Sequence, residues 1–272
     1  MRVALGLEYE GSRFCGWQTQ PSRCAVQDAV DAALSAIAAH PVQAQCAGRT
    51  DAGVHALGQV VHFDTSARRP LSAWVRGANA LLPDSIAVQW AREVSGDFHA
   101  RNRATGRIYN YLVLNRSERP GVHHARIGWY HRPLDLASMR AAARCLIGSH
   151  DFSAFRAAEC QAASPVKELR RAEIQRFGGL VVFEFAADAF LHHMVRNLVG
   201  CLVKIGAGTR PPEWLTEVLE SRDRARAAPT FPPDGLYLTA VEYDAVWGLP
   251  APRGRLPFDV FLSAGLASIV LS

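Results

Sequence analysis

Residues 42–64 read V-Q-A-Q-C-A-G-R-T-D-A-G-V-H-A-L-G-Q-V-V-H-F-D, and this stretch predicts a strand, a turn and a second strand. Apolar and polar residues alternate over Val42–Ala47, as in a half-buried strand. Gly53 favours a tight turn, and alternation resumes over Gln59–Asp64. We therefore expect two neighbouring strands joined by an irregular segment rich in polar side chains.

Outward from this stretch, the same order of strands and helices is predicted twice along the chain. The elements expected in the first half are a strand Arg2–Glu10, a helix Val26–His40, strands Val42–Ala47 and Gln59–Asp64, a helix Leu71–Leu81 and a strand Ile86–Val94. Those expected in the second half are a strand Arg107–Asn115, a helix Leu136–Leu146, strands Leu169–Arg176 and Leu180–Ala186, helices Phe190–Gly206 and Pro212–Ser221, and a strand Leu236–Asp244. Both halves have the order β-α-β-β-α-β once the extra helix Pro212–Ser221 is treated as an insertion.

This order predicts the α+β class, with two ferredoxin-like, RRM-like halves whose antiparallel sheets are covered by helices on one side. We expect an N-terminal domain over 1–105, a C-terminal domain with the inserted helix over 106–250, and a tail of unknown role over 251–272. Two such sheets joined side by side would leave an open cleft on the other side, where a ligand can bind.

Composition narrows the class of protein. The chain has 272 residues and 30 basic against 25 acidic side chains, a net charge of +5 that permits a nucleic-acid partner without requiring one. Nearly all the basic residues are arginine, which binds phosphate with two parallel hydrogen bonds. No apolar run is long enough to span a bilayer and no signal peptide opens the sequence, so we expect a cytoplasmic protein without a membrane partner.

The six cysteines are scattered without a C-x-x-C pair, which predicts reduced and mostly buried thiols. The histidine pairs His123-His124 and His192-His193 point neighbouring side chains to different faces, unlike a metal clamp. No metal is expected, because neither H-E-x-x-H nor a Cys/His ligand spacing occurs.

Asp51 lies between Gly48 and Gly53, with Arg49 before it and His55 after it. A carboxylate at a strand-to-turn junction beside a guanidinium is held ionised and directed outward. The alternative is an ordinary Arg–Asp pair that closes a surface turn. The loop Gly11–Gln20 leaves a similar choice, between an RNA-contacting loop and aromatic side chains that pack onto the core.

Several short motifs are spread over most of the chain. They are G-S-R-F-C-G-W-Q-T-Q (Gly11–Gln20), A-V-Q-D-A-V (Ala25–Val30), G-R-T-D-A-G-V-H-A (Gly48–Ala56), D-F-H-A-R (Asp97–Arg101), R-I-Y-N-Y (Arg107–Tyr111), C-L-I-G-S-H-D-F (Cys145–Phe152), F-L-H-H-M-V-R-N (Phe190–Asn197) and G-L-Y-L (Gly235–Leu238). Together they resemble the tRNA pseudouridine synthase A family. The resemblance extends from about Arg2 to Pro250. It implies an isomerase that converts uridine to pseudouridine at positions 38–40 of the tRNA anticodon stem-loop.

The resemblance also implies roles for individual residues. Asp51 matches the aspartate that attacks the target uridine after the base is flipped. Tyr109 matches the tyrosine that stacks on that base, and Arg49 the arginine that fills the space it leaves. Arg196 matches the arginine that pairs with the catalytic carboxylate, and Leu236 the apolar residue of the uracil pocket.

The family resemblance further implies no cofactor and a homodimer that holds one tRNA across both subunits. Arg13, Arg101 and Arg107 are additional candidates for RNA phosphate contacts. One alternative is a non-catalytic RNA-binding protein or tRNA chaperone built on the same sheets. A metal-dependent nuclease is disfavoured, because no further carboxylates cluster near Asp51 in the sequence.

Overall fold

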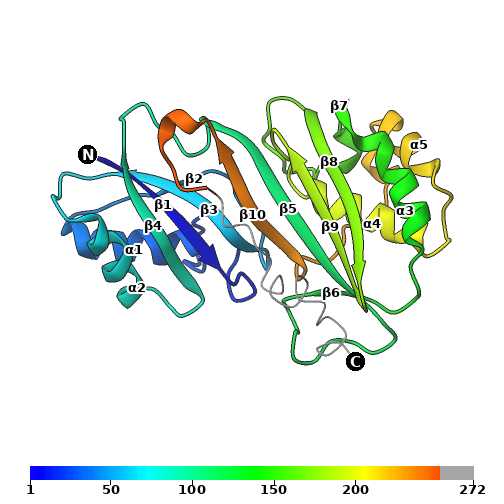
Figure 1. Ribbon diagram of the computed structural model, residues 1–272, viewed down its shortest axis with the longest axis horizontal. Coiled ribbons are helices and arrows are strands. Elements are labelled where there is room, and N and C mark those ends of the chain that lie inside the picture. Colours follow the sequence, from blue (N-terminus) through cyan, green and yellow to red (C-terminus); the bar gives the residue numbers. More distant parts are fainter. Residues whose placement is uncertain (252–272) are drawn as a thin grey trace. The chain divides into compact units, whose positions relative to one another are not determined.

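A computed structural model describes residues 1–251, and these residues form two compact units. Unit 1 comprises Met1–Gly106 together with residues 237–251, and unit 2 comprises Arg107–Leu236. Both units combine antiparallel strands with helices, so the predicted α+β class is confirmed (Figure 1). The tail predicted at 251–272 lies outside the described residues, apart from Ala251.

The sheet of unit 1 is built around β1, which pairs antiparallel with β3 on one side and β4 on the other. Its strands are β1 (Arg2–Tyr9), β2 (Gln45–Cys46), β3 (His55–Asp64), β4 (Ile86–Val94) and β10 (Leu236–Tyr243). Most of β1 is buried, as expected for a central strand with a paired neighbour on each side. The sheet thus provides a rigid base next to the quoted stretch.

In the quoted stretch, β2 is shorter and β3 is longer than the strands predicted from the sequence. Only Gln45 and Cys46 form β2, because pairing with β3 continues no further back than the Gln45–His62 pair. β3 in turn begins at His55 rather than at Gln59, because its first residues pair in parallel with β10. That pairing partner comes from the far end of the chain, and local alternation does not reveal it.

The helices of unit 1 lie on one face of its sheet (Figure 1). They are α1 (Val26–Ala38), a stretch of π-helix η1 (Ala73–Gly77) and α2 (Ala78–Leu81). Trp74 of η1 is fully buried and packs edge-to-face on Phe63 of β3, with ring centroids 5.0 Å apart. Burial of such an aromatic pair contributes several kcal/mol, roughly 2–3 from each side chain's apolar area.

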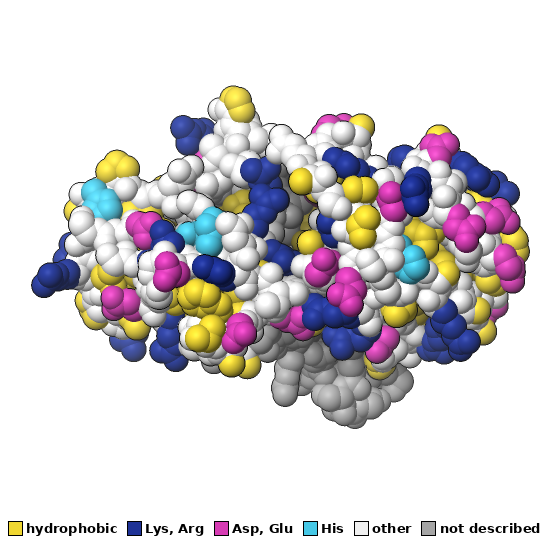
Figure 2. Space-filling view, turned by 90° about the horizontal axis from the view of Figure 1, so that it is seen from above, with side chains coloured by type: hydrophobic (Ala, Val, Ile, Leu, Met, Phe, Trp, Pro, Cys, Tyr) yellow, Lys and Arg dark blue, Asp and Glu magenta, His cyan; other side chains and the backbone are white. Residues whose placement is uncertain are grey.

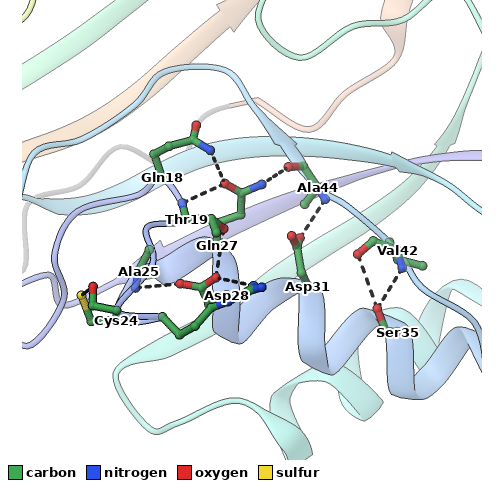
Figure 3. A network of polar contacts seen from close by, with 12 residues as sticks. Gln18, Thr19, Cys24, Ala25, Gln27, Asp28, Asp31, Ser35, Val42 and Ala44 are labelled. Carbon is green, nitrogen blue, oxygen red and sulfur yellow. Dashed lines mark hydrogen bonds and ion pairs between the residues drawn. The ribbon is translucent and has the colours of Figure 1, made fainter.

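Polar side chains fix α1 to the segment that leads into β2 (Figure 3). Asp31 accepts a hydrogen bond from the Ala44 N–H at 2.8 Å, and Gln27 donates to the Ala44 carbonyl at 3.1 Å. At the helix start, Asp28 accepts from the Ala25 N–H at 3.0 Å, satisfying an orphan donor. The Ser35 hydroxyl oxygen accepts a hydrogen bond from the Val42 N–H at 2.9 Å. The extended segment before the quoted turn therefore depends on α1.

Unit 2 contains the pairings β5–β9, β9–β8 and β8–β7, all antiparallel, with β6 parallel to β5. Its strands are β5 (Ala104–Asn115), β6 (Gly128–Tyr130), β7 (Gly148–Asp151), β8 (Val166–Phe177) and β9 (Leu180–Ala187). Its helices are α3 (Leu136–Ala143), η2 (Arg144–Leu146), η3 (Ser153–Phe155), α4 (Met194–Gly206), α5 (Trp214–Ser221) and η4 (Arg224–Arg226), and the short η5 (Ala245–Trp247) follows β10 in unit 1. The hairpin of β8 and β9 confirms the predicted pair of strands.

The boundary between the two units falls inside the last predicted strand and not at the expected domain boundary. Leu236 opens β10 in unit 2, whereas Tyr237 and the residues after it belong to unit 1. Tyr237 and Leu238 pair in parallel with His55 and Ala56 of β3. The expected C-terminal domain over 106–250 therefore does not coincide with unit 2, because the chain returns to unit 1 at this strand.

The expectation that every cysteine is reduced is wrong for Cys15 and Cys24, which form a disulfide. Their Cα atoms lie 5.5 Å apart, within the range that a disulfide spans. A hydrogen bond of 3.0 Å from the Cys15 N–H to the Cys24 carbonyl holds the two ends of the loop together. The separation of nine residues does not by itself predict that the two cysteines are close, because the fold of the loop brings them together.

Within residues 1–251, no helix has the length and apolar character that crossing a membrane requires.

Asp31 provides a pH test of the contacts around α1. Burial raises the pKa of its carboxyl to about 6, above the ordinary value of about 4. The unfolded chain thus releases this proton at lower pH than the folded chain, and stability falls as pH rises from about 4 to about 6. Asp31→Asn does not titrate and keeps an oxygen for the Ala44 N–H. Its melting temperature relative to wild type should rise by roughly 2–4 °C over that interval and stay level above it.

The measurement is a series of thermal melts between pH 4 and pH 8. Asp84→Asn, at an exposed carboxylate in the turn before β4, is the matched control and should show no such trend. A difference between Asp31→Asn and wild type that is constant from pH 4 to pH 7 would contradict the assignment.

Candidate active site

The segment between β2 and β3 carries Arg49 and Asp51. The last ladder bond before it runs from the Ala47 N–H to the Val60 carbonyl at 2.8 Å. A turn then closes through the Val54 N–H and the Asp51 carbonyl at 3.1 Å, with Gly53 at φ 80°. This left-handed conformation suits glycine, so the predicted turn is confirmed.

Exposure changes from residue to residue along this segment. Arg49 is exposed, Thr50 is buried and Asp51 is half-buried. The Thr50 side chain points into unit 1 and anchors the backbone, while the carboxylate of Asp51 stays within reach of solvent. A half-buried carboxylate on a fixed backbone is suited to act on a ligand that approaches from outside.

The loop Gly11–Gln20 supports the segment through its backbone. The Trp17 N–H donates to the Thr50 carbonyl at 2.9 Å. Gly16 has φ 96°, and a Cβ atom there would lie 2.7 Å from the Thr50 oxygen and 3.1 Å from the Asp51 carbonyl carbon. Trp17 is buried, so this aromatic packs onto the core, whereas Arg13 remains exposed at the surface.

His55 closes the segment at the start of β3. Its buried ring stacks on Tyr237 with centroids 4.6 Å apart, and Nδ1 accepts the Gly11 N–H at 2.9 Å. Nδ1 therefore carries no hydrogen in this arrangement. These contacts give His55 a structural role that connects the loop, β3 and β10.

Two arginines lie near the buried thiol of Cys46. Burial raises the pKa of this thiol to about 12, and the positive charges of Arg49 and Arg101 act in the opposite direction. Both guanidinium groups therefore lie close enough to Cys46 to influence it, and both are exposed. Figure 2 shows basic side chains interspersed with acidic ones on the face in view. Arg49 and Arg101 both contribute positive charge near Cys46, at the end of β2.

In unit 2, Tyr109 lies on β5 and is almost fully buried. It pairs with Phe185 of β9 and meets Phe190 edge-to-face, with ring centroids 5.0 Å apart. On the same strand, Arg107 donates to the Asp188 carbonyl at 2.8 Å. Aromatic packing therefore holds the Tyr109 ring in place.

Arg196 lies in the first turn of α4 and is half-buried. Its Nε donates to the Phe231 carbonyl at 2.8 Å, while its own carbonyl accepts the Phe231 N–H at 3.2 Å. The next residue, Asn197, is fully buried and donates to the Phe155 carbonyl at 2.8 Å. Because α4 begins at Met194 rather than at the predicted Phe190, Arg196 lies near the helix start.

Leu236 follows a close approach of backbones within unit 2. Gly235 accepts the Leu112 N–H at 2.8 Å, and a Cβ atom on it would lie 2.3 Å from the Leu112 carbonyl oxygen. Leu236 is buried at the start of β10. The segment from Phe231 to Leu236 thus contacts Arg196 at one end and β5 at the other. It therefore connects Arg196 and Leu236 to the strand that carries Tyr109.

The predicted residues therefore fall into two groups. Arg49 and Asp51 lie in unit 1, with the exposed Arg13 and Arg101. The group in unit 2 consists of Tyr109, Arg196, Leu236 and Arg107.

A sequence pattern described as tRNA pseudouridine synthase matches residues 7–101 and 142–244, which include Arg49, Asp51, Arg196 and Leu236. The chain belongs to the tRNA pseudouridine synthase family. Family membership agrees with the resemblance seen in the sequence, and the two matched ranges cover most of both units.

Relatives in the tRNA pseudouridine synthase family match nearly the whole chain. A protein of Thiobacillus denitrificans named tRNA pseudouridine synthase A is 62% identical over 95% of this chain and 99% of its own length. A protein of Dechloromonas aromatica with the same name is 58% identical over 93% and 97%. A chain in a solved archaeal box H/ACA sRNP Nop10–Cbf5 complex aligns with 83% of this chain and 59% of its own at 14% identity and a TM-score of 0.35, too low to bear on function.

Sequence reasoning missed the residues that hold the family signature in place. Gly16, Tyr9 and Gln59 all contact the segment Gly48–Asp51, yet none was predicted to do so. Gln59 is a polar residue at the start of the predicted strand Gln59–Asp64, but the alternation of that strand did not distinguish it from the other polar residues. The other two contacts require the fold of the loop and of β1.

Gly16 tests how closely the loop must approach the signature. In Gly16→Ala, the new Cβ would overlap the Thr50 carbonyl and the residue would be strained at positive φ, so we expect a loss of about 1–3 kcal/mol in the free energy of unfolding. Urea unfolding followed by tryptophan fluorescence measures it. Gly96→Ala, where nothing lies within 4 Å of the new Cβ, is the matched control. Equal midpoints for the two variants would show that the approach is not tight.

Proposed function

We propose that this chain catalyses the isomerisation of uridine to pseudouridine in tRNA, with Asp51 as the nucleophile. The observation that carries the proposal is the half-buried carboxylate on a backbone segment that buried neighbours hold rigid, inside the stretch G-R-T-D-A-G-V-H-A. The names of the relatives supply the reaction and the class of substrate. We propose the anticodon stem-loop, positions 38–40, as the region modified.

The chemistry requires few groups. The bond between N1 of uracil and C1′ of ribose breaks, the ring turns, and C5 bonds to C1′. C5 then loses its hydrogen as a proton, and N1 takes up a proton. Attack by the Asp51 carboxylate at C6 or at C1′ divides this exchange into two easier steps. The substrate and product are isomers, so the reaction needs no redox or group-carrying cofactor.

The remaining predicted residues are proposed to handle the flipped base. Tyr109, fixed by its contact with Phe190, would stack on the uracil, and Leu236 would line the pocket. Arg196 would pair with the carboxylate of Asp51 and keep it ionised. Arg49, exposed beside the nucleophile, would fill the space left in the RNA and offset the few kcal/mol that unstacking costs.

Binding of tRNA would depend on exposed arginines. Arg13 and Arg101 lie at the surface of unit 1 and are proposed to contact phosphate, as is Arg107 of unit 2. Each such contact adds salt dependence to binding, so the affinity for tRNA should fall steeply as salt rises.

We also propose a cytoplasmic homodimer that holds one tRNA across both subunits. Light scattering after size exclusion should give twice the mass of the chain. A monomer mass that persists in the presence of tRNA would refute the dimer and leave the proposed reaction untouched.

Asp51→Asn and Asp51→Ala test the nucleophile. Either change should lower tritium release from tRNA labelled at C5 of uridine by on the order of 10³-fold or more, because the covalent step is lost. Filter binding should give a dissociation constant for tRNA within a few-fold of wild type.

Asp84→Asn, at an exposed carboxylate of the same unit, is the control and should release tritium at the wild-type rate. If Asp51→Ala forms pseudouridine at a rate near wild type, Asp51 is not the nucleophile. If wild-type protein binds tRNA without any tritium release, the chain is a non-catalytic RNA-binding protein or tRNA chaperone instead.

A further inference from the structure

A fully buried amide lies beneath the segment that carries Asp51. Gln59 has no exposed surface, and its Nε2 donates to the Gly48 carbonyl at 2.7 Å and to the Tyr9 hydroxyl at 3.4 Å. Its Oε1 accepts the Val60 N–H at 3.2 Å. Every polar atom of this side chain therefore has a partner, as burial demands.

The partners of Gln59 determine which way its amide is turned. The Gly48 carbonyl only accepts hydrogen bonds, and the Val60 N–H only donates. The amide nitrogen must therefore face Gly48, and its second hydrogen points to Tyr9. The phenol oxygen accepts from the amide and also shares a hydrogen bond of 2.7 Å with Thr50 Oγ1, in which either oxygen can donate.

The result is a chain of hydrogen bonds that links Gln59, Tyr9 and Thr50, the residue before Asp51. The residues on either side of Arg49 are each held by a hydrogen bond, Gly48 at its carbonyl and Thr50 at its hydroxyl. Thr50 is held a second time by the Trp17 N–H at 2.9 Å, and the Trp17 ring packs against Tyr9 with centroids 6.1 Å apart. These contacts all lie within unit 1.

We propose that Tyr9 and Gln59 are positioning residues for Asp51, which set the direction of its carboxylate through Thr50 and Gly48 without touching RNA. The proposal rests on the proposed role of Asp51 as nucleophile. A displacement of about 1 Å in a reacting group can lower a rate by about 10²-fold, whereas binding of the large substrate spreads over many contacts. Loss of the chain of hydrogen bonds should therefore lower kcat and leave KM nearly unchanged.

Tyr9→Phe removes only the hydroxyl and keeps the ring that packs on Trp17. Thr50→Val removes the hydroxyl and keeps the shape of the side chain. Each variant should lower the single-turnover rate of tritium release by about 10-fold or more, with KM within about twofold of wild type. Gln59→Met, which loses both donor hydrogens, should have the same effect. Thr50→Ser, which keeps a hydroxyl, should regain most of the rate lost in Thr50→Val.

The double variant Tyr9→Phe with Thr50→Val separates positioning from general damage. If the two hydroxyls act as one unit, the double variant should be about as slow as either single variant, because the interaction is already lost. Rate losses that multiply to about 100-fold would show that the two residues act independently, which would overturn the proposal.

Tyr243→Phe is the matched control, because it also removes a hydrogen-bonded tyrosine hydroxyl in unit 1. The Tyr243 hydroxyl donates to the Ala100 carbonyl at 2.6 Å. Tyr243→Phe should lower the melting temperature about as much as Tyr9→Phe and leave the rate of tritium release unchanged. Equal rate losses in Tyr243→Phe and Tyr9→Phe would mean that only stability is involved, and the proposal would fail.

The two proposals fail in different ways. If Asp51→Asn is inactive while Tyr9→Phe and Thr50→Val are as fast as wild type, the nucleophile stands and the positioning role is wrong. If Asp51→Asn is itself active, the nucleophile is wrong, and any loss of rate in Tyr9→Phe must have another cause.

Discussion

Backbone that belongs to neither a strand nor a helix must find other partners for its polar groups when it is buried. The segment between β2 and β3 meets this constraint with help from three directions. Gln59 satisfies the Gly48 carbonyl, Trp17 satisfies the Thr50 carbonyl, and the turn at Gly53 satisfies the Asp51 carbonyl. Without these partners an irregular segment would move, and the side chains that it carries would have no fixed direction.

Much of the fold follows from periodicity alone. The strand Ile86–Val94 has the predicted bounds, and the helical region Leu71–Leu81 has the predicted extent. The π-helical turn inside that region escapes prediction, because apolar spacing does not distinguish it from α-helix over one turn. The partner of β10 also escapes it, since parallel pairing between His55 and Tyr237 joins residues far apart in sequence.

The sequence likewise revealed only some of the residues that form the candidate site. Asp51 stands out because it is a lone carboxylate between glycines with Arg49 close by, whereas Tyr109, Arg196 and Leu236 were named only through the family resemblance. The supporting contacts could not be named at all, because Tyr9 reads as one more residue of an alternating strand. The disulfide of Cys15 and Cys24 escaped for a related reason, since loop geometry brings the two thiols together. Pattern reveals which residues differ from their surroundings, but contacts depend on the complete fold.

The return of the chain to unit 1 at β10 has a consequence for the order of events on the ribosome. Chains fold as they emerge, and the N-terminal region generally folds first, at a synthesis rate of about 5–20 residues per second. Here His55 and Ala56 of β3 cannot pair with Tyr237 and Leu238 of β10 until residues 107–236 have been synthesised. Until then the start of β3 is an open strand edge, and such edges invite pairing with the wrong chain. The nascent protein therefore acquires the support of β10 next to the signature only after residues 107–236 have been synthesised.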